Sequence, residues 1–357
     1  MDFNFWRNKR VFITGHTGFK GSWLALWLRN LGASVTGYAL PPTSTQTLFN
    51  TLGLDTKITS LFGDISDLAS VRDAVVSVDP EIIVHMAAQP LVQDSFHNPY
   101  ETFSTNVMGT VNILEAVRFC SSVRAVVVVT TDKCYQNNEW IWSYRENDRL
   151  GGDDPYSSSK ACAELVTHSF YQSFFEKGSS TLGGVAVATV RAGNVIGGGD
   201  WAKNRLLPDL VRSIELGQEI TLRNPNATRP WQFVLEPLRG YLVLAQRLFE
   251  DGHDFSGGWN FGPSAGEART VKWVVGAMCN ALGVESKWGT DKEQYFPEKQ
   301  VLCLDISKAE NKLQWKPVLS VGEGVRLTAD WYSTYFSGEN LYDKAQEQIL
   351  SYESLTR

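Results

Sequence analysis

The chain has 357 residues, of which 43% are hydrophobic and 20% are charged, and its formal net charge is −6. This composition is typical of an ordinary globular protein and excludes a disordered or fibrous chain. The negative charge, without any cluster of lysines or arginines, argues against a nucleic-acid or membrane-surface partner. No apolar run approaches the roughly 20 residues that a membrane-spanning helix needs.

The cysteines and the first residues indicate a compartment. The chain begins with MDFNFWRNKR and enters an apolar strand at once, so we expect no signal peptide. Its five cysteines are widely spaced and form no CxxC pair, which predicts free thiols in a reducing cytoplasm. The five histidines are dispersed, so we expect no metal site.

An apolar strand, a glycine-rich turn and a helix follow one another between Arg10 and Leu31. Glycines in such a turn let backbone N–H groups approach phosphates, and the helix N-terminus adds partial positive charge. The alternative is that three glycines simply make a tight turn. The stretch predicts a dinucleotide diphosphate site formed by Gly15, His16, Thr17, Gly18, Phe19 and Gly21.

Strands and helices then alternate along the chain. We predict further strands at 34–39, 61–64, 81–86, 125–130 and 184–190, and long helices at 100–119 and 156–175. This order predicts a Rossmann-like α/β fold, a doubly wound parallel sheet with ligands at the carboxyl ends of its strands. After Arg191, glycines and prolines break the periodicity, which indicates a smaller and less regular lobe. The dinucleotide domain is expected at 1–193 plus about 232–262, and the substrate lobe at about 194–231 plus 263–357.

The strand ends indicate which dinucleotide is bound. The second strand ends at Gly37–Leu40, without the carboxylate that usually holds the ribose of NAD and without an arginine for a 2′-phosphate. NAD is therefore favoured over NADP, although its ribose lacks an obvious partner. Asp64, followed by Ile65, either binds the adenine or caps the next helix. His85 lies in an apolar run and is expected to be a packed core residue. The fourth strand is followed by Ala87, Ala88 and Gln89. Small residues there let the backbone lie close to a flat ligand.

Three residues make up a predicted catalytic group. Tyr156 and Lys160 stand four apart on one helix, so their side chains share a face, and Thr131 ends the fifth strand. A phenol titrates at about 10, and a lysine one turn away stabilises the phenolate. The hydroxyl of Thr131 can bond the same substrate oxygen. The group suits removal of a proton from a sugar alcohol while its carbon gives a hydride to a nicotinamide.

Together these motifs resemble the extended short-chain dehydrogenases/reductases and, among them, the nucleotide-sugar 4,6-dehydratases. The resemblance is greatest to the members that act on CDP-D-glucose, through His16, Lys133 and the segment 197–201. It spans nearly the whole chain and rests on GHTGFKG, GDI, HMAAQP, TNVMGT, TTDKCY, YSSSK, RAGNVIGGGDW and ATRPWQFV.

The resemblance implies a reaction with NAD as cofactor and CDP-glucose as substrate. In this family the sugar is oxidised at C4, water leaves across C5 and C6, and the hydride returns to C6, giving a 4-keto-6-deoxy sugar for surface polysaccharide. The alternative is another nucleotide-sugar 4,6-dehydratase or a 4-epimerase. A non-enzymatic dinucleotide sensor would be expected to lack Tyr156 and Lys160, and both are present.

The elimination step needs an acid and a base. In the related dTDP-glucose enzymes an Asp–Glu pair follows the threonine, whereas this chain has Asp132 and Lys133. The resemblance implies that Asp132 is the acid only if burial raises its pKa, and that Lys133 is the base only if it is partly desolvated and its pKa is lowered. Alternatively, Lys133 only tunes Asp132, or the two residues form a turn without a catalytic role.

The resemblance also implies the remaining contacts. Asn106 would support the nicotinamide, unless it is an interior polar residue that bonds local backbone. Arg229 is the best clamp for the substrate diphosphate, because a guanidinium binds phosphate bidentately. Asn194 and Arg205 are weaker candidates, and Arg205 equally suits a surface role. The hexose is expected to contact Gln93 and Ser95.

The two long helices, 100–119 and 156–175, are apolar beyond one face. In the family such helices pair across a two-fold axis. The resemblance therefore implies a homodimer joined by a four-helix bundle.

Overall fold

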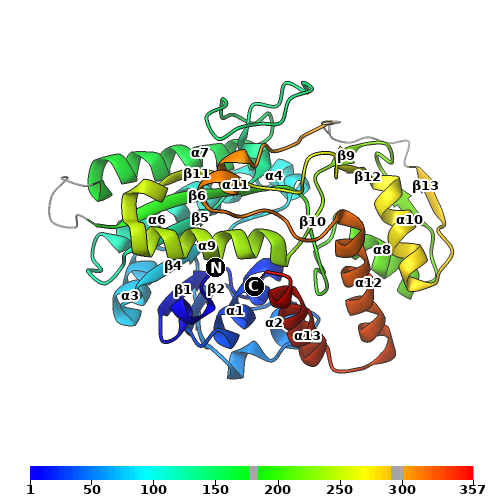
Figure 1. Cartoon of the computed structure of the whole chain (residues 1–357), viewed down its shortest axis with the longest axis horizontal. Helices are drawn as coiled ribbons and strands as arrows, with labels where there is room; N and C mark the ends of the chain where they lie inside the picture. Colours follow the sequence, from blue (N-terminus) through cyan, green and yellow to red (C-terminus); the bar gives the residue numbers. More distant parts are fainter. Residues whose placement is uncertain (177–183, 291–298, 300, 357) are drawn as a thin grey trace.

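The computed structural model of the chain describes residues 1–176, 184–290, 299 and 301–356. Its centre is a sheet of seven parallel strands in the order β11-β6-β5-β4-β1-β2-β3 (Figure 1). The chain runs outward from β1 to β3 and then builds the other half from β4, which is the doubly wound topology predicted from the sequence. The strands are β1 (Arg10–Thr14), β2 (Ser34–Ala39), β3 (Thr59–Phe62), β4 (Ile82–His85), β5 (Ala125–Val129), β6 (Ala186–Ala192) and β11 (Gly257–Phe261).

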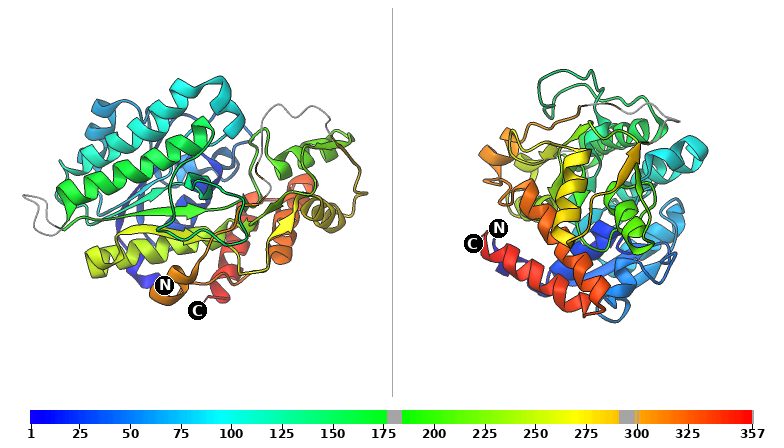
Figure 2. Two further views of the ribbon diagram at one scale, coloured as in Figure 1. Left: turned by 90° about the horizontal axis from the view of Figure 1, so that it is seen from above. Right: turned by 90° about the vertical axis from the view of Figure 1, so that its right-hand side faces the viewer.

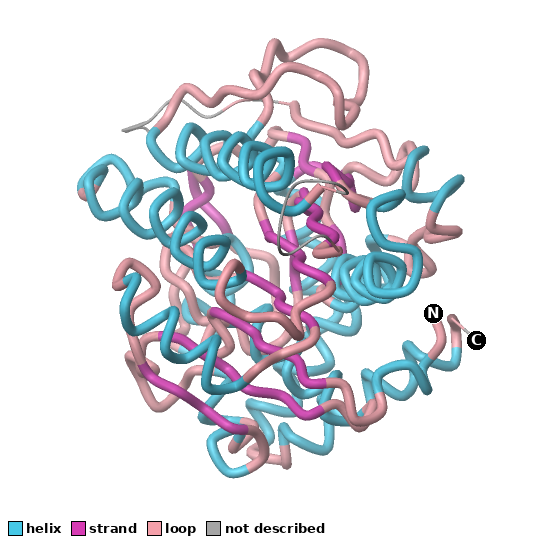
Figure 3. Tube along the Cα trace, turned by 90° about the vertical axis from the view of Figure 1, so that its left-hand side faces the viewer, coloured by secondary structure: helices cyan, strands magenta, loops and turns pink. Residues whose placement is uncertain are grey.

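Helices cover both faces of this sheet, and Figure 3 shows the strands enclosed between them. One face carries α3 (Leu68–Val78), α6 (Gly109–Val117) and α7 (Pro155–Phe170). The other face carries α1 (Phe19–Asn30) and α9 (Leu235–Asp251). Figure 2 shows α6 and α7 running side by side on the outside of the molecule.

The central strands β1, β4 and β5 are mostly apolar because both of their faces are buried. Phe12 and Val126 belong to the core beneath α3 and α6. Their neighbours Val11, Ile13 and Val127 belong to the core beneath α1 and α9. Successive side chains of a strand point to opposite faces, so a strand between two helix layers needs an apolar residue at every position.

The two long helices of the sequence each contain a π-helical turn. The first consists of α5 (Pro99–Phe103), η3 (Ser104–Met108) and α6, and α7 continues into η5 (Tyr171–Phe175). A π turn adds one residue to the helical circuit and is often found at functional sites. Here η3 carries Asn106, which is 1% exposed.

The smaller lobe lies beyond the carboxyl ends of the strands, at the right in Figure 1. It contains three two-stranded sheets, β10-β7, β12-β9 and β13-β8. Its elements are β7 (Val195–Ile196), α8 (Leu206–Glu215), β8 (Ile220–Leu222), β9 (Thr228–Arg229), β10 (Gln232–Phe233), β12 (Arg269–Thr270), α10 (Val271–Leu282), β13 (Trp288–Thr290) and α12 (Val321–Ser337). The short elements elsewhere are η1 (Phe3–Trp6), α2 (Leu48–Thr51), η2 (Leu54–Thr56), α4 (Val92–His97), η4 (Asp132–Cys134), η6 (Gly252–Phe255) and α11 (Ser307–Lys312).

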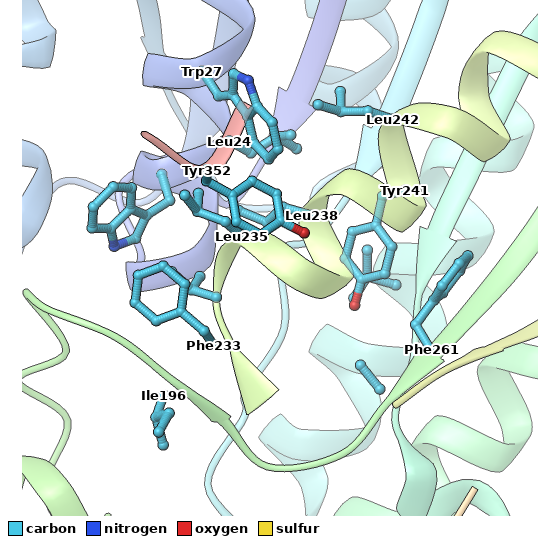
Figure 4. Close-up of a cluster of buried hydrophobic side chains, with 14 of the residues drawn as sticks. Leu24, Trp27, Ile196, Phe233, Leu235, Leu238, Tyr241, Leu242, Phe261 and Tyr352 are labelled. Atoms are coloured by element: carbon cyan, nitrogen blue, oxygen red, sulfur yellow. The ribbon is translucent and has the colours of Figure 1, made fainter. Parts of the chain in front are cut away.

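The last helix, α13 (Leu341–Ser354), packs against α12 of the smaller lobe, and the predicted domain boundaries stay a prediction. It also reaches α1, where the Trp27 indole N–H donates to Glu353 Oε1 at 2.8 Å. Figure 4 shows Tyr352 beside Trp27 and Leu24. A fully buried indole N–H needs an acceptor, and the C-terminal helix supplies it.

Gly198 is a position where the fold requires a glycine. A Cβ there would lie 2.0 Å from Trp331 Cγ of α12, a fully buried ring, and the Gly198 carbonyl accepts the Trp23 indole N–H at 3.0 Å. We therefore expect Gly198→Ala to lower the free energy of unfolding by about 1–3 kcal/mol, through overpacking. Urea unfolding followed by circular dichroism measures this loss.

Gly276→Ala in α10 is the matched control, because nothing lies within 4 Å of the Cβ it would add. This change should be neutral or should stabilise the helix by about 0.5–1 kcal/mol. Equal destabilisation by the two substitutions would contradict the steric explanation.

Candidate active site

The glycine turn lies against the loop after β4. Gly15 has a φ of +76°, and a Cβ there would approach the Ala87 nitrogen to 2.8 Å. A Cβ on Gly21 would lie 2.1 Å from the Gly15 carbonyl oxygen. Gly18 is the N-cap of α1 and supplies no side-chain hydrogen bond, so the first N–H groups, beginning at Phe19, are available to an anion. The turn therefore has the shape and polarity of a diphosphate site.

His16 belongs to this turn, but its ring faces the ends of β2 and β3. Its Nε2 lies 3.1 Å from Ser60 Oγ, and a Cβ on Gly37 would lie 2.1 Å from the ring. Phe49 and Phe62 pack against the other sides. Burial lowers the pKa of His16 to about 4, although a backbone hydrogen bond opposes this shift, so the ring is neutral at pH 7. A contact of His16 with the cofactor stays a prediction.

The other residues expected near the adenosine have local roles in the fold. Asp64 Oδ1 accepts from the backbone N–H two residues further on at 2.8 Å, whereas Asp67 makes the N-cap of α3. Ile65 is buried, and Thr17 Oγ1 donates to the Leu40 carbonyl at 3.1 Å. The contact of Asp64 with adenine stays a prediction. The helix cap, which is the alternative role for Asp64, is made by Asp67.

His85 is a buried core residue, as predicted, and it links three elements. Its Nδ1 lies 2.7 Å from Thr14 Oγ1, and its Nε2 lies 3.2 Å from Thr110 Oγ1. Thr110 donates to the Asn106 carbonyl, so it accepts from Nε2, and Thr14 therefore donates to Nδ1. Burial lowers the pKa of His85 to about 3. The neutral ring ties β1, β4 and α6 together beneath the site.

Asn106 joins the loop after β4 to α7. Its Oδ1 accepts from the Gln89 N–H at 2.9 Å, and its Nδ2 donates to the Gln89 carbonyl and to Ser159 Oγ. Ser159 in turn donates to the Tyr156 carbonyl at 2.7 Å. These contacts are those of an interior polar residue that positions Ala88, Gln89 and Tyr156. Support of a nicotinamide by Asn106 stays a prediction.

The predicted catalytic residues meet at the end of β5. Asp154 caps α7, whose first turn carries Tyr156, and the Tyr156 side chain is hydrogen-bonded to Thr131. Lys160 Nζ donates to the Val129 carbonyl at 3.1 Å. Both residues are nearly enclosed, with 8% of Tyr156 and 6% of Lys160 exposed.

Burial controls the ionisation of this pair. It raises the pKa of Tyr156 to about 12, which the hydrogen bond with Thr131 opposes, and it lowers the pKa of Lys160 to about 8, which Glu164 opposes. The sequence argument expected Lys160 to bring the phenol into its working range. Desolvation outweighs that effect, and the Lys160 amine donates to the backbone carbonyl of Val129.

Sequence reasoning missed the ion pair beneath the catalytic residues. The buried Glu164 carboxylate accepts from Arg191 Nη2 at 2.7 Å and Nε at 2.8 Å, and also from the hydroxyls of Thr130 and Thr189. Burial opposes ionisation, but Arg191 and these bonds hold the pKa of Glu164 below its usual value. The spacing of Glu164, eight residues after Tyr156 on the same helix face, was the available signal.

Asp132 and Lys133 follow Thr131 in the single turn η4. Asp132 is 1% exposed, and its Oδ1 accepts from Thr131 Oγ1 at 3.1 Å and lies 3.6 Å from Lys133 Nζ. Among the described residues, nothing bonds its other oxygen, Oδ2. The Lys133 side chain is 36% exposed. Asp132 is thus buried and Lys133 is partly exposed, and the two residues also form the turn that the alternative anticipated. Their roles as acid and base stay predictions.

The residues expected to bind the substrate surround this centre. Arg205 Nη1 pairs with Asp200 Oδ2 at 3.0 Å, and its charge acts on Tyr156, so it faces the site. Arg229 is 8% exposed and donates to the Thr228 carbonyl. Asn194 Oδ1 is buried without a partner within the described part of the chain. Their diphosphate contacts stay predictions.

The two residues predicted to touch the hexose lie on α4. Ser95 is fully buried, and its hydroxyl donates to the Val92 carbonyl at 2.6 Å. Gln93 is half-buried. The hexose contacts of both residues stay predictions.

Metal-ion clusters and membrane-spanning helices are both absent from the described residues. No three His, Cys, Asp or Glu side chains there are grouped so as to hold a metal ion. Within the same ranges, no helix is long and apolar enough to cross a membrane.

Comparison with known proteins identifies the family. Residues 12–328 match the family model of GDP-mannose 4,6-dehydratase. The chain is 50% identical over 356 residues to a CDP-glucose 4,6-dehydratase of Salmonella typhimurium, covering 100% of this chain and 99% of that protein. It is 25% identical to a dTDP-glucose 4,6-dehydratase of Xanthomonas campestris, with 90% and 92% covered.

Solved structures share the fold. An epimerase from Methanothermobacter thermautotrophicus superposes with a TM-score of 0.81 at 22% identity, over 94% of this chain and 95% of that one. A dTDP-glucose 4,6-dehydratase from Streptomyces venezuelae, solved with NAD bound, gives 0.76 at 23% identity, over 92% and 98%. With the glycine turn and the Thr131, Tyr156 and Lys160 group in place, the family match shows that this chain belongs to the GDP-mannose 4,6-dehydratase family of short-chain dehydrogenases/reductases.

Proposed function

We propose that this protein is a CDP-D-glucose 4,6-dehydratase, an NAD-dependent hydro-lyase that forms CDP-4-keto-6-deoxy-D-glucose. The observation that carries the proposal is the 50% identity, over the whole chain, to the Salmonella typhimurium enzyme of that name. The site supports it, because Thr131, Asp132, Lys133, Tyr156 and Lys160 meet at one strand end.

The glycine turn fits NAD. Gly15 and Gly21 admit no Cβ, and the uncapped N-terminus of α1 presents N–H groups to a diphosphate. When bound, NAD supplies the hydride acceptor for C4 and the hydride donor for C6. The end of β2 offers no carboxylate to the adenosine ribose, so we expect weaker binding than in enzymes with that contact.

Tyr156 is the base for the first step. Its phenolate oxygen takes the proton of the sugar C4 hydroxyl and becomes a phenol, and Thr131 bonds the same sugar oxygen. Because burial raises the pKa of Tyr156 to about 12, the phenolate needs positive charge close by, and Lys160 on the same helix face is placed to supply it.

Asp132 and Lys133 serve the elimination. The Asp132 oxygen without a partner within the described residues is placed to hold the proton that the departing C6 hydroxyl requires. Lys133 Nζ, 3.6 Å from the other oxygen, either takes the C5 proton or keeps Asp132 in the required protonation state.

The direct test is a mass spectrum after incubation with NAD and CDP-glucose. A product lighter by one water, without net NADH, is the expected result. An unchanged mass would refute the dehydratase with this substrate, and a panel of dTDP-, GDP- and UDP-sugars would then identify another nucleotide or an epimerase.

Replacement of the proposed base tests the first step. We expect Tyr156→Phe to slow product formation by about 10²–10⁴-fold, because proton transfer loses its acceptor. Binding of NAD and of CDP should persist in calorimetric titrations. Tyr342→Phe, on the distant helix α13, is the control and should retain full activity. Normal turnover by Tyr156→Phe would remove Tyr156 from the mechanism.

Substitution of Asp132 or Lys133 should separate oxidation of the sugar from elimination of water. We expect Asp132→Asn and Lys133→Ala to oxidise the sugar and then stall, so that enzyme-bound NADH accumulates and is seen by its absorbance. Water loss in the product spectrum should fall in parallel. A variant that forms product at the normal rate would show that its residue has no part in elimination.

We further infer a cytoplasmic homodimer. All five cysteines are free, which suits a reducing compartment. Tyr100, Met108 and Leu165 expose apolar side chains on α5, η3 and α7, with Leu165 58% exposed. Adjacent helices with exposed apolar residues are suited to a four-helix bundle with a second copy.

The dimer is tested by one charge on that face. Leu165→Glu should give a monomer in sedimentation analysis, because a carboxylate in the bundle would be buried without a partner. Leu350→Glu on α13, where the leucine is 60% exposed, should leave the mass unchanged. The same oligomeric mass for both variants would exclude this face as the interface.

A further inference from the structure

Lys20 stands in the glycine turn, yet neither the sequence argument nor the proposed mechanism gives it a role. It is the second residue of α1, between Gly18 and Gly21. Its side chain is half-buried, and its Nζ lies 5.9 Å from the centre of the Tyr241 ring on α9. A charged residue in a turn that otherwise consists of small or apolar residues needs an explanation.

The amine of Lys20 lies within the active site. The charges that act on it belong to Lys160 on α7, Arg205 before α8 and Asp132 in η4. Lys20 thus lies within reach of two other cations and one carboxylate, and Arg205 is already paired with Asp200. Within the described ranges, no hydrogen bond or ion pair holds Lys20 Nζ. A desolvated amine among like charges is unfavourable unless a ligand with the opposite charge joins it.

Buried acceptors and donors around Lys20 also lack partners. Asp132 Oδ2 and Tyr241 Oη are buried and make no hydrogen bond with any described residue. Tyr241 is 1% exposed, and Figure 4 shows its side chain leaving α9 with the hydroxyl at the end away from Leu242. Buried polar atoms are almost always bonded in folded proteins, so these atoms indicate a polar ligand in this space.

We propose that Lys20 is a ligand-binding residue of the active site whose ammonium group contacts the diphosphate of a bound nucleotide. The identity of that nucleotide rests on the proposed function, in which both NAD and CDP-glucose carry a diphosphate. A lysine ammonium binds phosphate as a compact point charge, and the turn it comes from already directs backbone N–H groups toward an anion.

This role couples binding to proton uptake. Burial, helped by the charges of Lys160 and Arg205 and opposed by Asp132, lowers the pKa of Lys20 to about 7. Tyr241 contributes no charge at neutral pH, because burial raises its pKa. A bound anion raises the pKa of Lys20. Above pH 7, binding of the anion is therefore accompanied by uptake of a proton from solvent by the Lys20 amine. Affinity should then fall about tenfold per pH unit above 7, until the pKa of the complex is reached.

The experiment measures the affinities of NAD and of CDP separately, by calorimetric titration at about pH 6 and about pH 8.5. In the unmodified protein, the ligand that contacts Lys20 should bind up to about 30-fold more weakly at the higher pH. Lys20→Met should bind that ligand at least tenfold more weakly at the lower pH and should lose the pH dependence. Lys20→Arg, whose charge does not titrate, should bind tightly at both pH values.

The control is Lys57→Met, since Lys57 also lies over a tyrosine ring, that of Tyr342, but far from the glycine turn. It should behave as the unmodified protein. The ligand that loses affinity in Lys20→Met identifies which diphosphate Lys20 contacts.

The outcomes separate this proposal from the function. Unchanged affinities and pH dependence in Lys20→Met, with dehydration of CDP-glucose intact in the unmodified protein, would refute the assignment of Lys20 alone. If Lys20→Met binds the ligand more weakly and Lys20→Arg does not restore the affinity, the role of Lys20 is steric. That result would also refute the proposal. A protein that binds neither NAD nor CDP would overturn both proposals.

Discussion

The buried ion pair between Glu164 and Arg191 is the interaction on which the active site depends. The carboxylate also accepts from Thr130 and Thr189, so one charge fastens α7 to β5 and β6 at once. Loss of one partner of such a pair leaves a buried charge and costs about 3–5 kcal/mol. Because Thr131 follows Thr130, and because the helix of Glu164 also carries Tyr156, the ion pair holds together two halves of the catalytic group that lie on different elements.

The sequence predicts this architecture where the signal is local. The glycine spacing, the apolar strands and the tyrosine–lysine pair are short-range patterns, and each lies in the structure where its pattern placed it. Contacts between distant segments carry no such signal. The contact of α13 with α1 joins Trp27 to Glu353, because the buried indole N–H needs an acceptor. The π turn that carries Asn106 leaves no mark in a helical hydrophobic pattern, and the His16 ring turns toward Gly37 because that glycine makes room for it.

Burial moves the pKa values of the site toward neutral groups. The pKa of Tyr156 is raised to about 12, and those of Lys160 and Lys20 are lowered to about 8 and about 7. Burying the groups of a site costs less desolvation free energy when fewer of them are charged. The same groups ionise readily once a ligand supplies the opposite charge, since desolvation strengthens every electrostatic interaction within the site. The burial that disfavours ionisation of Tyr156 therefore also strengthens the effect of a charged ligand on its ionisation.

One turn of backbone explains how a single site can serve several chemical steps. Thr131, Asp132 and Lys133 are consecutive residues at the end of β5, and η4 directs the Thr131 hydroxyl to Tyr156 while Asp132 is buried behind it. The oxidation and the elimination act on neighbouring carbons, so their residues need only a few ångströms between them. Neighbouring positions in a tight turn provide that spacing without any movement of the domains. In the proposed mechanism the sugar therefore stays in place while Thr131, Asp132 and Lys133 act on it in succession.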